Sequence, residues 1–366
     1  MDAATALRPL VDAALGTDLP LRIDCWDGSS LGPADPAAAV RFTSPRALRR
    51  LVWAPNELGF ARAYVSGDVE IDGDLLGALT RLDELADPQR GPGVRLGADT
   101  TLAVVKAVAR LRAIGPPPRP PAEEIRLSGR RHTQGRDARA VSHHYDVGND
   151  FYALVLGPTM VYSCAYFEQP PSSGYTLEDA QLAKLDLVAH KLGLAPGMHL
   201  LDVGCGWGSF VIHAAREYGV DAVGVTLSEE QAAYARAVVA GAGLAGRVQI
   251  RVQDYRDVPD GPYDAIASIG MAEHVGRARL GDYAAHLHSL LAPEGRLLNH
   301  AISRRPGPEG DPRGDRTSFI DRYVFPDGEL HPLSTMVDAL ESAGLEVRDV
   351  ESLREHYVET LRSWVA

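Results

Sequence analysis

The second half of the chain alternates short apolar runs with longer amphipathic stretches. Buried strands are expected at His199–Val203, Ala222–Thr226, Val248–Val252, Ala265–Ile269 and Arg296–Ile302. Helices with one apolar face are expected at Gly208–Tyr218, Ser228–Ala242 and Asp282–Leu291. Because alternating strands and helices build a parallel sheet that is covered on both faces, we expect an α/β fold with a doubly wound, Rossmann-like sheet.

Residues 1–114 form a separate unit in this pattern. Leu21–Trp26 and Val40–Phe42 alternate like strands, and Asp27-Gly28 is a turn signal between them. A helix is expected through Trp53, with Ser44-Pro45 supplying its cap and first residue. The mixture predicts a smaller α+β N-terminal domain.

A linker is expected over residues 115–140, which places the second domain at 141–366. Its first part, within Ile114–Ala122, is proline-rich and therefore unsuited to a helix or a central strand. Its second part, Arg126–Arg139, carries five arginines and one aspartate. This basic part is either a solvated connector or a contact for anionic lipid headgroups.

Composition excludes several classes of protein. The net charge of -12 argues against a nucleic-acid binder, because phosphate neutralisation needs an excess of Lys and Arg. The three cysteines lack the spacing of a metal site or a disulfide framework, which fits a reducing cytosol. No secretion signal or apolar run of ~18 residues is present. We expect a cytoplasmic protein that touches the inner face of the membrane at most peripherally.

A glycine-rich turn follows the first predicted strand of the second domain. Asp202 lies inside the strand, and Gly204, Gly206 and Gly208 follow it in a G-x-G-x-G pattern. Such glycines let a ligand approach the backbone at the carboxyl end of the sheet. Taken alone, the turn is compatible with NAD, FAD or S-adenosylmethionine.

The ends of the next two strands narrow the choice of cofactor. The second strand ends in Val225–Ser228, without the acidic residue that usually binds the ribose of NAD, and its Thr226 and Ser228 hydroxyls offer hydrogen bonds instead. Gln253 and Asp254 close the third strand, where an adenine edge is expected. These features favour S-adenosylmethionine.

Four motifs in order resemble the cyclopropane-fatty-acyl-phospholipid synthase family, which includes the mycolic acid cyclopropane synthases. They are Ser142–Tyr152, Tyr162–Phe167, the glycine turn and Gly270–Gly276. The resemblance covers about Ser142 to Trp364, and the N-terminal region is more weakly similar to the accessory domain of phospholipid-acting bacterial members. Family members continue for several helices beyond the position of Ala366, where this chain ends.

The resemblance implies a class I methyltransferase fold and two sets of site residues. The S-adenosylmethionine site is expected to include Tyr162, Ser163, Gly204, Gly206, Thr226, Leu227, Gln231 and Gln253, beside Asp202, Gly208, Ser228 and Asp254 from the reading above. In the family a bound bicarbonate is thought to be the base, and the matching residues are Cys164, Glu273, His300, the backbone of Ile302 and Tyr357. Aromatic rings that match cation-stabilising positions are Tyr145, Tyr166 and Tyr323.

The activity that the resemblance implies is transfer of a methylene unit to the cis double bond of an unsaturated fatty acyl chain. The substrate is expected to be phospholipid-bound and the product a cyclopropane, with transient membrane contact and possible homodimerisation. A close alternative loses a different proton and gives a 10-methylene-branched chain. Alternatives of other classes are a non-catalytic lipid-binding subunit and a methyltransferase for a small amine or phenol.

Overall fold

The structure is a computed structural model that describes residues 2–366 except 16–18, 20, 37, 78, 81–108, 112, 114, 126, 146–147 and 307–318. The chain forms two compact units, residues 1–125 with 315–323, and residues 126–314 with 324–366. The domain limits expected from the sequence stay a prediction, and two residues at the ends of the expected linker parts, Ile114 and Arg126, lie outside the described residues. Each unit is described by itself.

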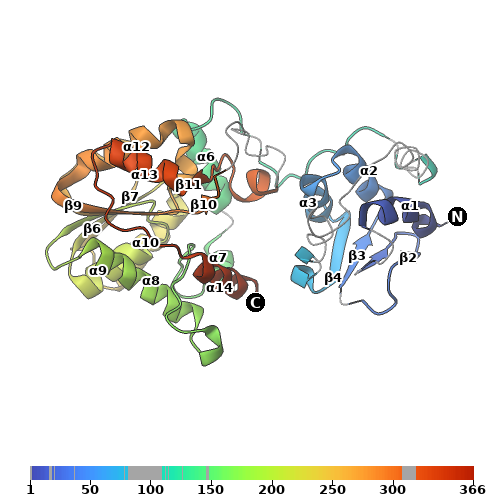
Figure 1. The fold of residues 1–366 in the computed structure, drawn as a ribbon, viewed down its shortest axis with the longest axis horizontal. Helices are drawn as coiled ribbons and strands as arrows, with labels where there is room; N and C mark the ends of the chain where they lie inside the picture. The colour runs from blue at the N-terminus through green and yellow to red at the C-terminus, as the bar shows by residue number, and fades with distance from the viewer. Residues whose placement is uncertain are drawn as a thin grey trace. The chain divides into compact units, whose positions relative to one another are not determined.

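The first unit is built on a four-stranded sheet in the order β2-β1-β3-β4 (Figure 1). Its strands are β1 (Arg22–Asp24), β2 (Ser30–Leu31), β3 (Ala38–Phe42) and β4 (Val69–Gly73). Its helices include α1 (Ala3–Leu15), α2 (Pro45–Trp53) and α3 (Glu57–Val65). Side chains from these helices and strands share one hydrophobic core, around Leu7, Leu48 and Val40.

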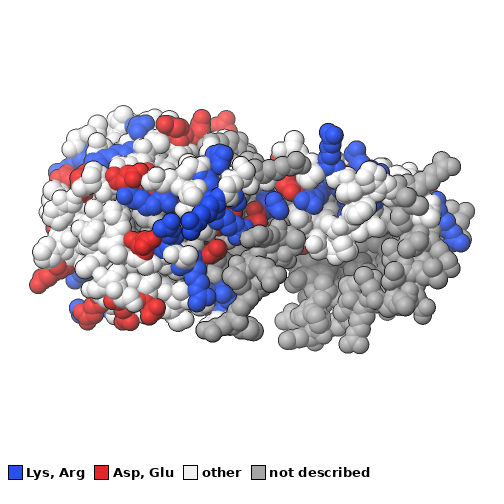
Figure 2. All heavy atoms as spheres, turned by 90° about the horizontal axis from the view of Figure 1, so that it is seen from above, with Lys and Arg blue, Asp and Glu red and all other residues white. Residues whose placement is uncertain are grey.

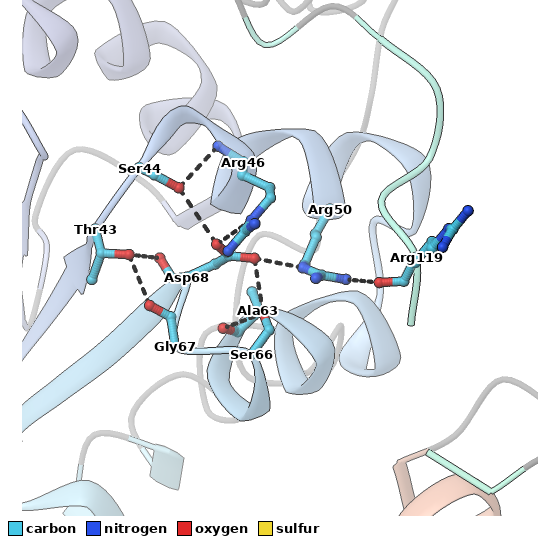
Figure 3. Close-up of polar contacts among 9 residues, drawn as sticks. All are labelled: Thr43, Ser44, Arg46, Arg50, Ala63, Ser66, Gly67, Asp68 and Arg119. Carbon is cyan, nitrogen blue, oxygen red and sulfur yellow. Dashed lines mark hydrogen bonds and ion pairs between the residues drawn. The ribbon is translucent and has the colours of Figure 1, made fainter. Parts of the chain in front are cut away.

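A buried carboxylate connects the elements of this unit (Figure 3). Ser44 caps α2 by accepting a hydrogen bond from the Arg46 backbone N–H. The Asp68 carboxylate, in the turn before β4, accepts from Arg46 Nε at 2.6 Å, Arg50 Nε at 2.7 Å and Ser66 Oγ at 2.8 Å. Asp68 is 1% exposed, so its charge is neutralised by partners inside the fold.

The second unit contains a five-stranded sheet in the order β7-β6-β5-β8-β9, and all neighbouring strands are parallel. The strands are β5 (His199–Val203), β6 (Asp221–Thr226), β7 (Val248–Val252), β8 (Tyr263–Ile269) and β9 (Leu291–His300). The strand order reverses direction at β5 and β8, which is where such sheets bind ligands.

Helices cover both faces of this sheet. One core packs α8 (Leu177–Leu192), α9 (Ser209–Tyr218) and α10 (Glu229–Gly241) on the sheet, and a second core packs α12 (Leu280–Leu290) and α13 (Leu333–Ser342). The doubly wound α/β fold is thereby confirmed. The predicted last strand, Arg296–Ile302, is wrong at both ends, because β9 already begins at Leu291 and stops at His300, so that Ile302 lies in the following loop.

Shorter elements complete the second unit. They are α6 (Gln134–Tyr145), α7 (Asn149–Leu156), η1 (Pro171–Ser173), η2 (Tyr255–Asp257), α11 (Ala272–Val275), η3 (Arg277–Arg279), β10 (Ser303–Arg304), β11 (His331–Pro332) and α14 (Arg354–Val365), while η4 (Ile320–Val324) crosses from the first unit to the second. None of the helices in the described part of the chain has the length and apolarity needed to cross a bilayer.

The basic segment expected to be part of the linker is built into the second unit. Helix α6 begins inside it at Gln134. Arg131 Nε lies 2.9 Å from an Asp327 oxygen, and Arg136 also pairs with Asp327. The Asp327 carboxylate is buried, so two of the segment's arginines neutralise a charge inside the fold.

Candidate functional site

A pocket opens at the carboxyl ends of β5, β6 and β8, beside the glycine turn. The turn is held by two hydrogen bonds, because the N–H groups of Gly204 and Cys205 both donate to the Val225 carbonyl, at 3.0 and 2.9 Å. Gly206 has a φ of +54°, and a Cβ at this position would meet no atom within 4 Å. The Gly206 backbone therefore faces open space in the pocket.

Nine of the twelve residues expected to bind the cofactor line this pocket. They are Tyr162, Ser163, Asp202, Gly204, Gly206, Thr226, Leu227, Gln231 and Gln253. Thr226 and Gln231 are fixed to each other, because Thr226 Oγ1 donates to Gln231 Oε1 at 2.8 Å. Residues far apart in the sequence are thus brought together at one edge of the sheet.

The other three expected cofactor residues do not line the pocket and have local roles. Gly208 is the N-cap residue of α9. Ser228 caps α10, where its Oγ accepts from the Gln231 N–H at 3.1 Å. Asp254 caps η2 and forms an ion pair with Arg256 at 2.6 Å.

Aromatic side chains form one wall of the site. Tyr145, Tyr162 and Trp207 line the pocket. Behind them, the ring centroid of Tyr152 lies 4.7 Å from that of Trp207 and 5.5 Å from that of Tyr162. The Trp364 ring of α14 lies 5.2 Å from Tyr162. The wall therefore presents the rings of Tyr145, Tyr162 and Trp207 to the pocket, which suits a ligand with hydrocarbon or cationic parts.

The remaining cation-stabilising candidates lie elsewhere. The Tyr166 ring packs on His356, with centroids 4.7 Å apart, and does not line the pocket. Tyr323 belongs to the first unit, where its hydroxyl donates to Glu124 Oε2 at 3.1 Å and its ring stacks on Phe319. Among the three predicted rings, Tyr145 is the one that lines the pocket.

Glu273 projects from α11, between Met271 and His274 in sequence. Gly270, Met271 and His274 are lining residues, whereas Glu273 is not. Its Oε1 accepts the Ile302 N–H at 2.7 Å, and its Oε2 is buried with no hydrogen-bond partner among the described residues. Burial raises the pKa of Glu273, because a charged carboxylate loses its hydration there.

Cys164, His300 and Tyr357 are the other expected base-site residues. Cys164 Sγ donates to the carbonyls of Ala165 and Leu353, the latter one turn before Tyr357 in sequence. Burial, together with the nearby groups of Tyr162, Cys164 and Glu273, raises the pKa of Tyr357 to about 12. His300 ends β9, and burial lowers its pKa to about 4, so its ring is neutral near pH 7. None of the three lines the cofactor pocket.

Sequence reasoning missed several residues that line the pocket, including Val141, Lys184, Phe210, Tyr255, Met271 and His274. Lys184 is the most unexpected, because its side chain is 3% exposed. The available signal was its spacing of three from Gln181 on α8, which places both on one helical face. Gln181 Nε2 donates to the Ser163 carbonyl at 2.9 Å, and Lys184 Nζ donates to Ser163 Oγ at 3.2 Å.

Comparison with known proteins gives a consistent family. The family model "Mycolic acid cyclopropane synthetase" matches residues 132–366. A protein of Mycobacterium tuberculosis named "Probable fatty acid methyltransferase" is 42% identical over 94% of this chain and 80% of its own length. The same organism's "Tuberculostearic acid methyltransferase" is 36% identical over 99% of this chain and 80% of its own length.

A solved structure supports the match at the level of the fold. The crystal structure of a mycolic acid cyclopropane synthase complexed with SAH (S-adenosylhomocysteine) and CTAB superposes with a TM-score of 0.57 and 38% sequence identity. It covers 62% of this chain and 81% of its own. The family model matches residues 132–366, the part of the chain that contains the lining residues of the pocket.

Proposed function

The chain belongs to the mycolic acid cyclopropane synthetase family and is an S-adenosylmethionine-dependent methyltransferase; from this premise we propose that it adds a methylene unit across the cis double bond of an unsaturated fatty acyl chain. The observation that carries the proposal is the unpartnered Glu273 Oε2, buried directly beside the cofactor pocket. Such a group fits proton chemistry on a substrate that reaches the pocket.

The pocket residues fit S-adenosylmethionine. The open space over Gly206 admits a ligand close to the backbone, and Thr226, Gln231 and Gln253 offer polar groups on the same side. Asp202 supplies a carboxylate in the lining. When bound, S-adenosylmethionine supplies an electrophilic methyl group on a positively charged sulfur.

The chemistry requires a cation to be stabilised and a proton to be removed. The alkene π electrons would form a new bond to the methyl carbon while its bond to sulfur breaks, which would leave S-adenosylhomocysteine and a positive charge on the other alkene carbon. The faces of Tyr145 and Tyr162 in the pocket wall would stabilise this charge, at ~0.5–2 kcal/mol for each ring. Loss of a proton from the new methyl group then closes the cyclopropane.

We propose bicarbonate as the base, held by the expected base-site residues Cys164, Glu273, His300 and Tyr357, called here the Glu273 cluster. The bicarbonate hydroxyl would donate to Glu273 Oε2, which has no donor among the described residues. Tyr357, which lies within electrostatic range of Cys164 and Glu273, would supply a donor to one of the anion's other oxygens.

We further propose that the acyl chain is carried by a phospholipid and reached from the cytoplasmic face of a membrane. In Figure 2, Lys and Arg side chains gather on one face with Asp and Glu side chains beside them, so contact with anionic headgroups would be weak and transient. Arg130 and Arg139, which are exposed, are the arginines of the basic segment best placed for it. Vesicle flotation with and without anionic lipid tests this contact, using Arg130→Gln/Arg139→Gln as the variant.

A second candidate product is a 10-methylene-branched acyl chain. The relatives that match 94% and 99% of this chain have names that specify a fatty acid and tuberculostearic acid methyltransferase, whereas a cyclopropane mycolic acid synthase matches 62%. The branched product shares the first step and differs in the proton lost.

Mass spectrometry of acyl chains from cells expressing the protein tests the proposed function. We expect a new species heavier by 14 mass units whose added carbon lies in a cyclopropane. An exocyclic alkene at that carbon would show that the product is the branched chain and not the cyclopropane. The absence of any one-carbon addition, from a protein that binds S-adenosylhomocysteine, would contradict acyl methylation itself.

A further inference from the structure

Lys184 is a buried cation that the proposed reaction does not use. It projects from α8 into the lining of the cofactor pocket and is 3% exposed. Its Nζ donates to Ser163 Oγ at 3.2 Å, and no carboxylate of the described residues lies within 4.0 Å of it. An ammonium group has three donors, so a neutral hydroxyl satisfies it poorly.

Burial without an anionic partner is expensive for such a group. Burial lowers the pKa of Lys184 to about 8, and the more distant Asp202 and Cys164 side chains oppose this only in part. A well-packed apolar residue would be more stable at this position. The retained charge therefore indicates a ligand that provides the missing anion.

The pocket also contains the opposite charge. Asp202 lies in the same lining, at the end of β5, and is likewise 3% exposed. Lys184 and Asp202 interact electrostatically but are not within ion-pair distance in the described part of the chain. A separated cation and anion in one pocket match an amino acid zwitterion, whose carboxylate and ammonium groups are also separated.

We propose that Lys184 is a cofactor-binding residue that binds the carboxylate of the methionine part of S-adenosylmethionine. Ser163 orients the ammonium group of Lys184 by accepting a hydrogen bond from it. The inference rests on the proposed cofactor site and adds a residue to it. A planar oxyanion at the Glu273 cluster is another source of the same ligand chemistry. The cofactor carboxylate is favoured because Lys184 lines the cofactor pocket and Glu273 does not.

Calorimetry with two probes tests the assignment. S-adenosylhomocysteine carries the carboxylate, and its decarboxylated analogue retains the ammonium group. We expect the wild-type protein to prefer S-adenosylhomocysteine by about tenfold to a hundredfold, as for a hydrogen bond to a charged group. Lys184→Met should reduce this preference to less than about threefold and raise the unfolding temperature of the ligand-free protein.

Lys191→Met is the matched control. Lys191 lies on the same helix but forms surface ion pairs with Asp349 and Glu351, so the variant should retain the wild-type preference between the probes. Lys184→Gln provides a second neutral side chain in case Lys184→Met does not fold.

Three results would overturn the inference. A preference that survives in Lys184→Met, with both affinities weakened equally, would mean that Lys184 only orders Ser163. If Lys184→Met keeps the preference but its turnover no longer depends on bicarbonate, Lys184 binds the bicarbonate base and not the cofactor carboxylate. Equal wild-type affinities for the two probes would exclude recognition of the carboxylate. Failure of the wild-type protein to bind S-adenosylhomocysteine would instead contradict the cofactor site itself.

Discussion

Buried charge is treated in opposite ways by two regions of the molecule, the Asp68 network of the first unit and the cofactor pocket of the second. In the first unit Asp68 is 1% exposed and is held by Arg46, Arg50 and Ser66. Burial raises the pKa of Asp68, but the hydrogen bonds from Arg50, Arg46 and Ser66 outweigh it, so the pKa falls below its usual value. The fold therefore stabilises this charge.

In the second unit the buried charges around the pocket lack such partners. Burial raises the pKa of Asp202 to about 7, raises that of Glu273 and lowers that of Lys184 to about 8. The fold disfavours each of these charges in the absence of a ligand. The difference separates a charge network that stabilises the protein from groups arranged to meet a ligand.

The largest expected effect concerns the backbone at the pocket. Gly206→Val should abolish saturable binding of S-adenosylhomocysteine, because the side chain would enter the space that the ligand occupies. Calorimetry measures this loss. Gly197→Val is the control, since Gly197 also has a positive φ, of +83°, and open space at its Cβ, but lies outside the pocket. Equal losses in both variants would show a folding defect instead.

Breaking the network of the first unit should reduce stability. Asp68→Asn leaves two arginines near a neutral amide, and loss of one partner of a buried ion pair costs ~3–5 kcal/mol. Asp72→Asn, whose exposed carboxylate pairs with Arg41, should cost less than ~1 kcal/mol. Denaturant unfolding measures both, and similar values for the two variants would contradict a structural role for Asp68.

Replacing Glu273, one of the buried groups without a charged partner, should affect the turnover rate more than the stability of the protein. Glu273→Gln is expected to lower turnover by ~10²–10³-fold, the usual cost of one partner at an oxyanion site. The affinity for S-adenosylhomocysteine should remain within a few-fold of the wild-type value. The exposed Glu346→Gln serves as the control. Wild-type turnover in Glu273→Gln would remove the proposed base site.

The smallest effect is a pH dependence of cofactor affinity. As the pH rises through about 7, Asp202 gains its charge and attracts the ligand's ammonium group; as it rises through about 8, Lys184 loses its charge and releases the carboxylate. Cys164 and His300, with pKa values of about 11 and about 4, keep their charge state over this range. We expect the cofactor affinity, measured by calorimetry, to be highest between these two pH values. In Lys184→Met the decrease in affinity above the maximum should be lost. A decrease in affinity at alkaline pH that persists in this variant would contradict the role of Lys184.

The direction in which stability changes with pH gives a further test of the Asp68 network in the first unit. Its folded pKa lies below the unfolded value of 3.8, so its contribution is present above about pH 4 and is lost as the pH falls through the folded pKa. The stability difference between wild type and Asp68→Asn should shrink over that range. A difference that grows on acidification would contradict the charged pairing.

The sequence predicted most of the second unit because its apolar runs have few alternatives. Strands β5 and β7 match the expected residues. In the first unit, Ser44 caps α2 as expected. Ser228 and Asp254 were assigned to the ligand because a polar residue at a strand end suits either a ligand or the next helix cap. Lys184 was missed because a lysine on an amphipathic helix is normally exposed, and burial becomes visible only in three dimensions.

The most direct measurement follows the methyl carbon. The purified protein is incubated with S-adenosylmethionine labelled with ¹³C at the methyl group and with vesicles of a cis-unsaturated phospholipid, and the acyl chains are analysed by mass spectrometry. We predict that the label enters the chain at the former double bond, and that Glu273→Gln does so at least a hundredfold more slowly. Label that is absent from the acyl chain, although the protein binds the cofactor, would contradict the central claim.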